Sequence, residues 1–214
     1  MIIQQMKKNL FIAFEGIDGS GKSTQVKLLA EAFEQNGHKV YTTCEPTDSA
    51  IGTLIRKIFK HEMEADHRTI AALFAADRLD HLLNKQSGIL NKLEQGYTVI
   101  TDRYYFSSYA YHSVHTDMDW VISLNQMSAT LLRPDLIIYL DIQAEQSMER
   151  LKNGRETIEL YETLENLRIV RSNYLTAFDL FQSTENIYKV DANRSTEAIA
   201  TEIKKQMTTI LSLR

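Results

Sequence analysis

A glycine-rich segment near the N-terminus constrains the fold more than any other feature of this chain. Residues 16–23 read Gly-Ile-Asp-Gly-Ser-Gly-Lys-Ser, an unbroken G-x-x-x-x-G-K-S pattern. An apolar run, residues 10–14, precedes it, and a helix-like stretch, residues 24–36, follows it. Buried strand, glycine-rich turn and helix start are together the context in which this pattern forms a phosphate-binding loop. A chance glycine-rich turn is the alternative, and it leaves the flanking strand and helix unexplained.

Each part of this loop suits a polyphosphate and a magnesium ion. The glycines leave room for main-chain N–H groups to converge on phosphate oxygens, and the helix start adds the positive end of its dipole. We expect Lys22 to reach the β- and γ-phosphates of a bound nucleotide and the Ser23 hydroxyl to bind Mg²⁺. The residues of this segment predicted to bind the nucleotide are Gly16, Asp18, Gly19, Ser20, Gly21, Lys22, Ser23 and Thr24.

The rest of the chain alternates between short apolar segments and long helical stretches. The predicted strands are residues 10–14, 40–43, 98–101, 136–140 and 187–190. The predicted helices are residues 24–36, 67–95 with a break at 87–88, 118–132, 157–181 and 195–213. This alternation predicts a three-layer α/β fold, a five-stranded parallel sheet with helices on both faces, like that of phosphate-loop NTP hydrolases. We expect a tail at residues 1–9, one domain over 10–214, and a lid at about 152–160.

The composition of the chain argues against nucleic acid and membranes as binding partners. The chain has 214 residues and a net charge of −4, which gives no electrostatic footprint for nucleic acid or for an anionic membrane. Cys44 is the only cysteine, which excludes an intrachain disulfide and fits a reducing compartment. No apolar run is long enough to cross a bilayer, and residues 1–9 do not resemble a secretion signal. These features favour a cytoplasmic protein acting on small molecules.

Polar residues follow the predicted strands at the sheet edge where the phosphate loop lies, which is where ligands bind in such folds. Asp102 ends an apolar strand and could hold Mg²⁺ through water; a strand-end or N-cap aspartate is the alternative. Asp141 occupies an equivalent place. Arg103 offers a planar fork of donors suited to a second phosphate, although an exposed arginine in a solvated salt bridge is the plainer reading.

Two further segments carry candidate functional groups. Phe74 and Arg78 are four residues apart in a predicted helix and share one face, where they could stack a base and donate to its carbonyl edge. Spacing alone favours a place in the core for Phe74 over a role as base platform. Lys152 and Arg155 flank Asn153-Gly154 in a small basic loop that could carry a cation onto a transferring phosphoryl group, or be an ordinary solvated loop.

Taken together, these segments resemble thymidylate kinase over nearly the whole chain. The resemblance is carried by residues 14–25, 45–47, 73–78, 102–111 and 133–141. It implies transfer of a phosphoryl group from ATP to dTMP with Mg²⁺, and a homodimer packed through helices. The open alternatives are another deoxynucleoside or nucleotide kinase and a non-catalytic nucleotide sensor or assembly factor, which would need neither a lid cation nor an acceptor pocket.

The resemblance also implies roles around the sugar and phosphates. Asp18 meets the 3′-hydroxyl of dTMP, and Tyr111 lies under the deoxyribose and crowds out a 2′-hydroxyl. Arg103, with Arg56, holds the dTMP phosphate. Arg150 lies near the adenine of ATP.

At the base, the resemblance implies that Phe74 stacks on thymine, Arg78 donates to its O4 and Pro46 lies near its methyl group. The other implied dTMP-binding residues are Glu45, Ser107, Ser108 and Tyr161, with Glu162 beside Tyr161.

Two positions depart from the commonest family pattern. Some members carry a basic residue inside the phosphate loop, where this chain has Gly19, so the catalytic cation is expected in the lid, at Arg155 or else Lys152. His112 stands where glutamine is frequent, which leaves a base contact from that position open.

Overall fold

A computed structural model describes residues 9–154 and 163–212, and its centre is a five-stranded sheet in the order β2-β3-β1-β4-β5. Every neighbouring pair of strands is parallel, as predicted. The strands are β1 (Phe11–Glu15), β2 (Val40–Cys44), β3 (Thr98–Asp102), β4 (Leu136–Asp141) and β5 (Ile187–Asp191).

Burial along the strands explains their composition. The central strand β1 is buried at every position, and its neighbours β3 and β4 are buried except at their last residue. Strands covered on both faces read as continuous apolar runs, which is why these three are the clearest strand signals in the sequence. The edge strands β2 and β5 are only partly buried and more polar.

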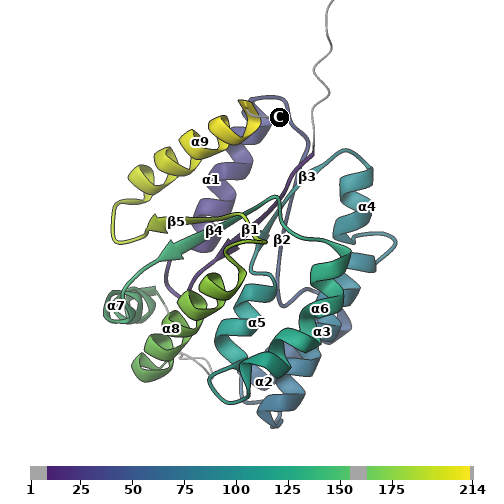
Figure 1. Cartoon of the computed structure of the whole chain (residues 1–214), viewed down its shortest axis with the longest axis vertical. Helices are drawn as coiled ribbons and strands as arrows, with labels where there is room; N and C mark the ends of the chain where they lie inside the picture. The colour runs from purple at the N-terminus through teal and green to yellow at the C-terminus, as the bar shows by residue number, and fades with distance from the viewer. Residues whose placement is uncertain (1–8, 155–162, 213–214) are drawn as a thin grey trace, which may run out of the picture.

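Helices cover both faces of the sheet, which confirms the three-layer fold (Figure 1). Helices α1 (Lys22–Gln35) and α9 (Thr196–Ser212) pack together on one face, and α5 packs against α8 and α6 on the other (Figure 1). The remaining bounds are α2 (Ala50–Phe59), α3 (His67–Leu83), α4 (Ile89–Glu94), α5 (Tyr105–His112), α6 (Met118–Leu131), α7 (Ala144–Gly154) and α8 (Leu164–Phe181).

Several helix boundaries differ from the sequence prediction, and residues 152–154, predicted to begin a loop, instead end helix α7. The stretch predicted over 67–95 is two helices, α3 and α4, separated near the predicted break at Ser87-Gly88. The pattern does not predict α2, whose N-cap Ser49 accepts from the main-chain N–H groups of Ile51 and Gly52. It also misses α5, whose aromatic sequence is typical of a strand and whose residues are all buried, so tertiary packing stabilises it.

The carboxyl ends of β1, β2 and β3 converge beside the start of α1. The phosphate loop follows β1, Glu45 follows β2, and Arg103 follows β3. Hydrogen bonds between main chains hold these ends together: Glu45 donates to the carbonyl of Asp102, and Arg103 donates to the carbonyl of Phe14. The parallel sheet thus brings residues from three distant segments to one edge.

Candidate active site

A cavity of about 580 Å³ lies at this edge of the sheet, between the phosphate loop and α2, α3, α5 and α7. It joins residues that the sequence assigns to two different nucleotides. Its lining residues are Asp18, Gly19, Gly21, Lys22, Ser23, Thr24, Cys44, Glu45, Pro46, Arg56, Phe59, Lys60, Phe74, Asp102, Arg103, Ser107, Ser108, Tyr111, His112, Arg150 and Leu151.

The phosphate loop presents a buried lysine to the cavity. Helix α1 begins at Lys22, directly after Gly21 in the left-handed conformation, so its first N–H groups face the loop. The Lys22 ammonium donates to the carbonyl of Ile17 at 3.0 Å. Burial, together with the positive charge of Arg103, lowers the pKa of Lys22 to about 8. An incoming polyphosphate would remove much of this penalty, since it supplies the negative charge that the lysine lacks.

Ser23 and Asp102 form a pair suited to a divalent cation. The Ser23 hydroxyl donates to Oδ2 of Asp102 at 2.5 Å. The other carboxylate oxygen, Oδ1, is buried and has no hydrogen-bond partner in the described part of the chain. A hydroxyl and a carboxylate with an unsatisfied oxygen are the hard oxygen donors that Mg²⁺ prefers, directly or through water. These residues therefore fit the predicted magnesium site.

Asp18 is the centre of a second polar group. Its carboxylate accepts from the guanidinium of Arg103 and, at 2.7 Å, from the hydroxyl of Tyr111. The same hydroxyl accepts from the main-chain N–H of Asp18 at 2.9 Å. Burial alone would raise the pKa of Asp18, but Arg103 and Lys22 hold it below its ordinary value. The ionised carboxylate of Asp18 thus links the phosphate loop to the end of β3 and to α5.

The sequence analysis did not identify Glu15, which contacts this polar group through Ser107. Its buried carboxylate accepts from the main-chain N–H groups of Tyr104 and Ser107, and from the hydroxyls of Ser107 and Tyr174. Burial raises the pKa of Glu15, an effect that these bonds and Arg103 oppose. The Ser107 hydroxyl also accepts from Arg103 at 3.0 Å, so Glu15 helps to fix the arginine. No sequence spacing signals this contact, since 92 residues separate Glu15 from Ser107.

Aromatic rings close the opposite end of the cavity. Phe74 is buried on α3, with its ring centroid 5.7 Å from that of Phe59 and 4.9 Å from that of His112. Burial, with Arg78 nearby, lowers the pKa of His112 to about 3, so its imidazole is neutral at physiological pH. Pro46 lines the same region. This part of the cavity is therefore lined by aromatic rings, including a neutral imidazole.

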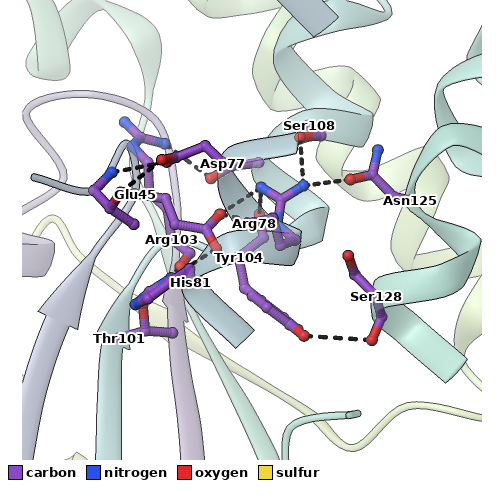
Figure 2. Close-up of polar contacts among 12 residues, drawn as sticks. Glu45, Asp77, Arg78, His81, Thr101, Arg103, Tyr104, Ser108, Asn125 and Ser128 are labelled. Atoms are coloured by element: carbon purple, nitrogen blue, oxygen red, sulfur yellow. Dashed lines mark hydrogen bonds and ion pairs between the residues drawn. The ribbon is translucent and has the colours of Figure 1, made fainter. Parts of the chain in front are cut away.

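Arg78 is fully buried and does not line the cavity. Figure 2 shows its guanidinium among Glu45, Ser108 and Asn125. Five hydrogen bonds engage its guanidinium: two to Glu45 Oε2, one each to Ser108 Oγ and Asn125 Oδ1, and one to the carbonyl of Tyr104. A guanidinium has five N–H donors, so protein groups can satisfy all of them. In this arrangement Arg78 reaches the cavity through Glu45 and Ser108, which both line it.

The same network extends to the loop after β2. His81 contacts Glu45 Oε1 through Nδ1 at 3.1 Å and the hydroxyl of Thr43 through Nε2 at 2.7 Å. Asp77 accepts from the N–H of Thr47 at 2.8 Å and from the hydroxyl of Ser49. These contacts fix Glu45 and Pro46 in place at the cavity wall.

The structure gathers most, though not all, of the predicted site residues. Gly16 and Ser20 belong to the phosphate loop but do not line the cavity. Arg155 and Tyr161 lie outside the described residues. Asp141, the second candidate metal carboxylate, instead forms ion pairs with Arg171 at 2.7 Å and Lys189 at 2.8 Å.

The two remaining predicted arginines line the cavity from different helices. Arg56 on α2 donates to the carbonyl of Pro46 and to Asp48. Arg150 on α7 donates to the carbonyl of Ala192 at 2.9 Å. The cavity also has lining residues that the sequence did not single out: Cys44, Phe59, Lys60 and Leu151.

Sequence comparisons with known proteins agree with the nucleotide-binding character of this site. The family model described as thymidylate kinase matches residues 14–203. The chain belongs to the thymidylate kinase family. A probable thymidylate kinase of Pyrococcus horikoshii is 44% identical over 180 residues, covering 81% of this chain and 85% of that protein. That of Thermococcus gammatolerans is 40% identical over 203 residues, covering 91% and 93%.

A more distant relative also matches most of the chain. The probable thymidylate kinase of Methanocaldococcus jannaschii is 35% identical over 200 residues, which are 92% of this chain and 95% of that protein. The three probable thymidylate kinases thus match between 81% and 92% of this chain. Within the described ranges of this chain, no helix has both the length and the hydropathy that a membrane span requires.

Proposed function

We propose that this protein transfers the γ-phosphoryl group of ATP to dTMP, giving ADP and dTDP, and so contributes to the supply of dTTP. The observation that carries the proposal is a single cavity with two chemically different ends. One end is the phosphate loop with Lys22 and the Ser23–Asp102 pair, and the other is the aromatic compartment around Phe74. Membership of the thymidylate kinase family supports ATP as the donor.

Charge placement and alignment account for most of the proposed chemistry. Phosphoryl transfer spreads negative charge over the moving group and requires in-line attack, so positioning and cations matter more than proton transfer. The loop amides and Lys22 would hold the donor phosphates, and Arg103 would orient the phosphate of dTMP. An anionic phosphate oxygen is already a nucleophile, so no general base is needed.

Ser23 and Asp102 are the proposed holders of Mg²⁺. When bound, the ion would neutralise charge on the β- and γ-phosphates. The close hydroxyl–carboxylate pair and the unsatisfied Oδ1 of Asp102 support this assignment. Asp141 is a poorer candidate, because its carboxylate is held by two cations.

Recognition of the acceptor falls to Asp18, Tyr111 and Phe74. Asp18 and the Tyr111 hydroxyl are proposed to face the 3′-hydroxyl and the ring of the deoxyribose, and Phe74 to stack on thymine. Arg56 is proposed to assist Arg103 at the phosphate, since both line the cavity.

Selection for thymine is proposed to depend on donors at its O4. Arg78 donates to Ser108 Oγ at 2.9 Å, which leaves the hydroxyl hydrogen of Ser108 available for an acceptor in the cavity. A direct contact from Arg78 to O4 would require it to exchange one of its protein partners. Either route places a donor opposite O4, and the N4 amino group of cytosine would oppose it at a cost of about 1–3 kcal/mol. Discrimination against dUMP, which lacks one methyl group near Pro46, is expected to be about 10- to 200-fold.

A homodimer is proposed through the outer face of α3 and α6. Exposed or half-buried apolar residues recur there at helical spacing: Ala72, Ala76, Leu79 and Leu83 on α3, and Trp120, Leu124, Met127 and Leu131 on α6. The two helices pack side by side (Figure 1). A continuous apolar stripe on neighbouring helices is typical of a surface that pairs with a second copy. We also propose a cytoplasmic location, which the single cysteine, Cys44, supports.

The competing function is phosphorylation of a deoxynucleoside, and a substrate panel separates the two. With coupled detection of ADP, we expect turnover with dTMP, weak turnover with dUMP, and none with thymidine or dCMP. Activity with thymidine and none with dTMP would overturn the proposal. A non-catalytic sensor would show no ADP formation with any acceptor.

A further inference from the structure

Helix α7 lies directly against the phosphate loop, at a point that the family resemblance does not single out. Ser147 on α7 is fully buried, and its hydroxyl donates to the main-chain carbonyl of Asp18 in the middle of the loop. The contact joins residues 129 apart in the chain. It adds a third anchor to a residue that Tyr111 and Arg103 already hold from the acceptor side.

The next residue of the loop confirms how closely the two segments approach. Gly19 has a φ of +74°, and a Cβ atom built there would lie 2.7 Å from the carbonyl oxygen of Ser147 and 3.2 Å from Cγ of Leu151. The first of these is a backbone atom, which cannot turn aside as a flexible side chain could. Any other residue at position 19 would therefore push α7 away from the loop.

The same helix supplies one wall of the cavity. Arg150 and Leu151 both line it, and they follow Ser147 by three and four residues. Residues at this spacing share one face of a helix, so the anchor and the lining residues move as one unit. A small rotation of α7 about its contact with the loop would displace Arg150 from the donor side of the cavity.

We propose that Ser147 is a positioning residue, whose hydroxyl fixes α7 against the phosphate loop and thereby places Arg150 and Leu151 beside a donor nucleotide bound there. The inference rests on the proposed binding of ATP at the loop. Ser147 touches no substrate in this account, because it acts through the carbonyl of Asp18 and through its own helix.

Two ligands separate this role from a simple effect on the loop. A non-hydrolysable ATP analogue engages both the loop and the α7 wall, whereas inorganic tripolyphosphate engages the loop alone. For Ser147→Ala, loss of one hydrogen bond should weaken the analogue about 3- to 10-fold. Affinity for tripolyphosphate and for dTMP should stay within about two-fold of the parent, the size of a marginal hydrogen-bond effect.

Ser128→Ala is the matched control. Ser128 is also buried on a helix, α6, and within the described chain its Oγ has no hydrogen-bond partner. Alanine is the best helix former, so both variants should retain their helices. If Ser147→Ala nevertheless unfolds, Ser147→Cys keeps the volume with a weaker donor and should show the same selective loss.

The outcomes are distinct. Selective weakening of the ATP analogue in the Ser147 variant, absent from the Ser128 variant, supports the inference. Unchanged affinity for the analogue overturns it, as does equal weakening of analogue and tripolyphosphate, which would place the effect in the loop itself. These titrations need no turnover of dTMP, so they remain decisive even if the acceptor proves to be another nucleotide.

Discussion

The hydroxyl of Ser23 and the carboxylate of Asp102 meet at 2.5 Å, although 79 residues separate them in the chain. The parallel pairing of β1 with β3 creates this contact, since it sets Phe14 opposite Asp102 at the edge where α1 begins. Two oxygen ligands of the proposed magnesium site are thus fixed by sheet register.

Replacing Asp102 with Asn should make the enzyme dependent on higher magnesium concentrations. Asn keeps the shape but loses the negative charge, and loss of a partner that holds a metal through water typically costs about 10- to 100-fold in affinity or activity. The measurement is kcat as a function of Mg²⁺ concentration. Asp141→Asn is the control, because that strand-end carboxylate is paired with Arg171 and Lys189. Equal magnesium dependence in the two variants would contradict the assignment.

The charge of Lys22 predicts a pH limit on capture of ATP. Burial lowers the pKa of Lys22 to about 8, so the lysine of the free enzyme loses its proton as pH rises through that value. The ratio kcat/KM for ATP, which reports the free enzyme, should therefore decline above about pH 8. At saturating ATP, kcat should hold to higher pH, because bound phosphates restore the charged form. A flat kcat/KM profile well above pH 8 would count against this role.

Replacing the aromatic ring of Phe74 should weaken the binding of dTMP and leave the binding of ATP unchanged. Phe74→Leu keeps an apolar side chain in the core while losing the flat ring, and base–aromatic stacking is worth about 1–3 kcal/mol, or roughly 5- to 150-fold. We expect KM for dTMP to rise within this range and KM for ATP to change little. The unfolding temperature shows whether the core tolerates the change. A parallel rise in both KM values would place Phe74 in the scaffold alone.

The lid cation is a prediction from the sequence, since Arg155 lies outside the described residues. Arg155→Ala should lower kcat by about 100-fold with a smaller change in KM, because the charge is needed mainly as the phosphoryl group transfers. Lys152→Ala is the matched comparison, since Lys152 is exposed at the end of α7. Survival of activity in the first variant and its loss in the second would move the role to Lys152.

A charge on the outer face of α6 should dissociate the proposed dimer. Met127 is 59% exposed, so Met127→Lys should leave the fold intact in a monomer but cannot be buried between two copies without a charge penalty. Light scattering coupled to size-exclusion chromatography measures the mass. Leu180→Lys, at a similarly exposed apolar residue of α8, should leave the mass unchanged. Equal masses for both variants and the parent would exclude this face as the interface.

Local signals in the sequence predict the frame of the protein but leave parts of the helical layer unresolved. The five strands and the phosphate loop are readable because each is a short segment whose own residues define it. Helix α5 is not, because its run of Tyr, Phe and Ser favours other structures and only burial against α6 and α8 makes it helical. Helix α2 has a readable cap in Ser49, but Gly52 near its start weakens the helical pattern.

The candidate site divides in the same way. Motifs identify Lys22, Arg103 and Phe74, because each belongs to a segment with its own recognisable pattern. Contacts between residues far apart in the chain have no such pattern. Examples are the hydrogen bonds from Ser107 to the carboxylate of Glu15 and from Ser147 to the carbonyl of Asp18. Arg78 shows the limit most clearly. Its spacing from Phe74 places it on the right helix face, yet only the structure reveals that protein groups take up its donors.

The central claim is that both nucleotides meet within one cavity, and a crystal structure with dTMP and a non-hydrolysable ATP analogue tests it most directly. We expect thymine against Phe74, the triphosphate on the loop, and a dTMP phosphate oxygen facing the γ-phosphorus at about 3–3.5 Å, the separation of a reactive pair. The account would be contradicted if dTMP bound outside the cavity. It would also be contradicted if a protein group lay between the dTMP phosphate and the γ-phosphorus.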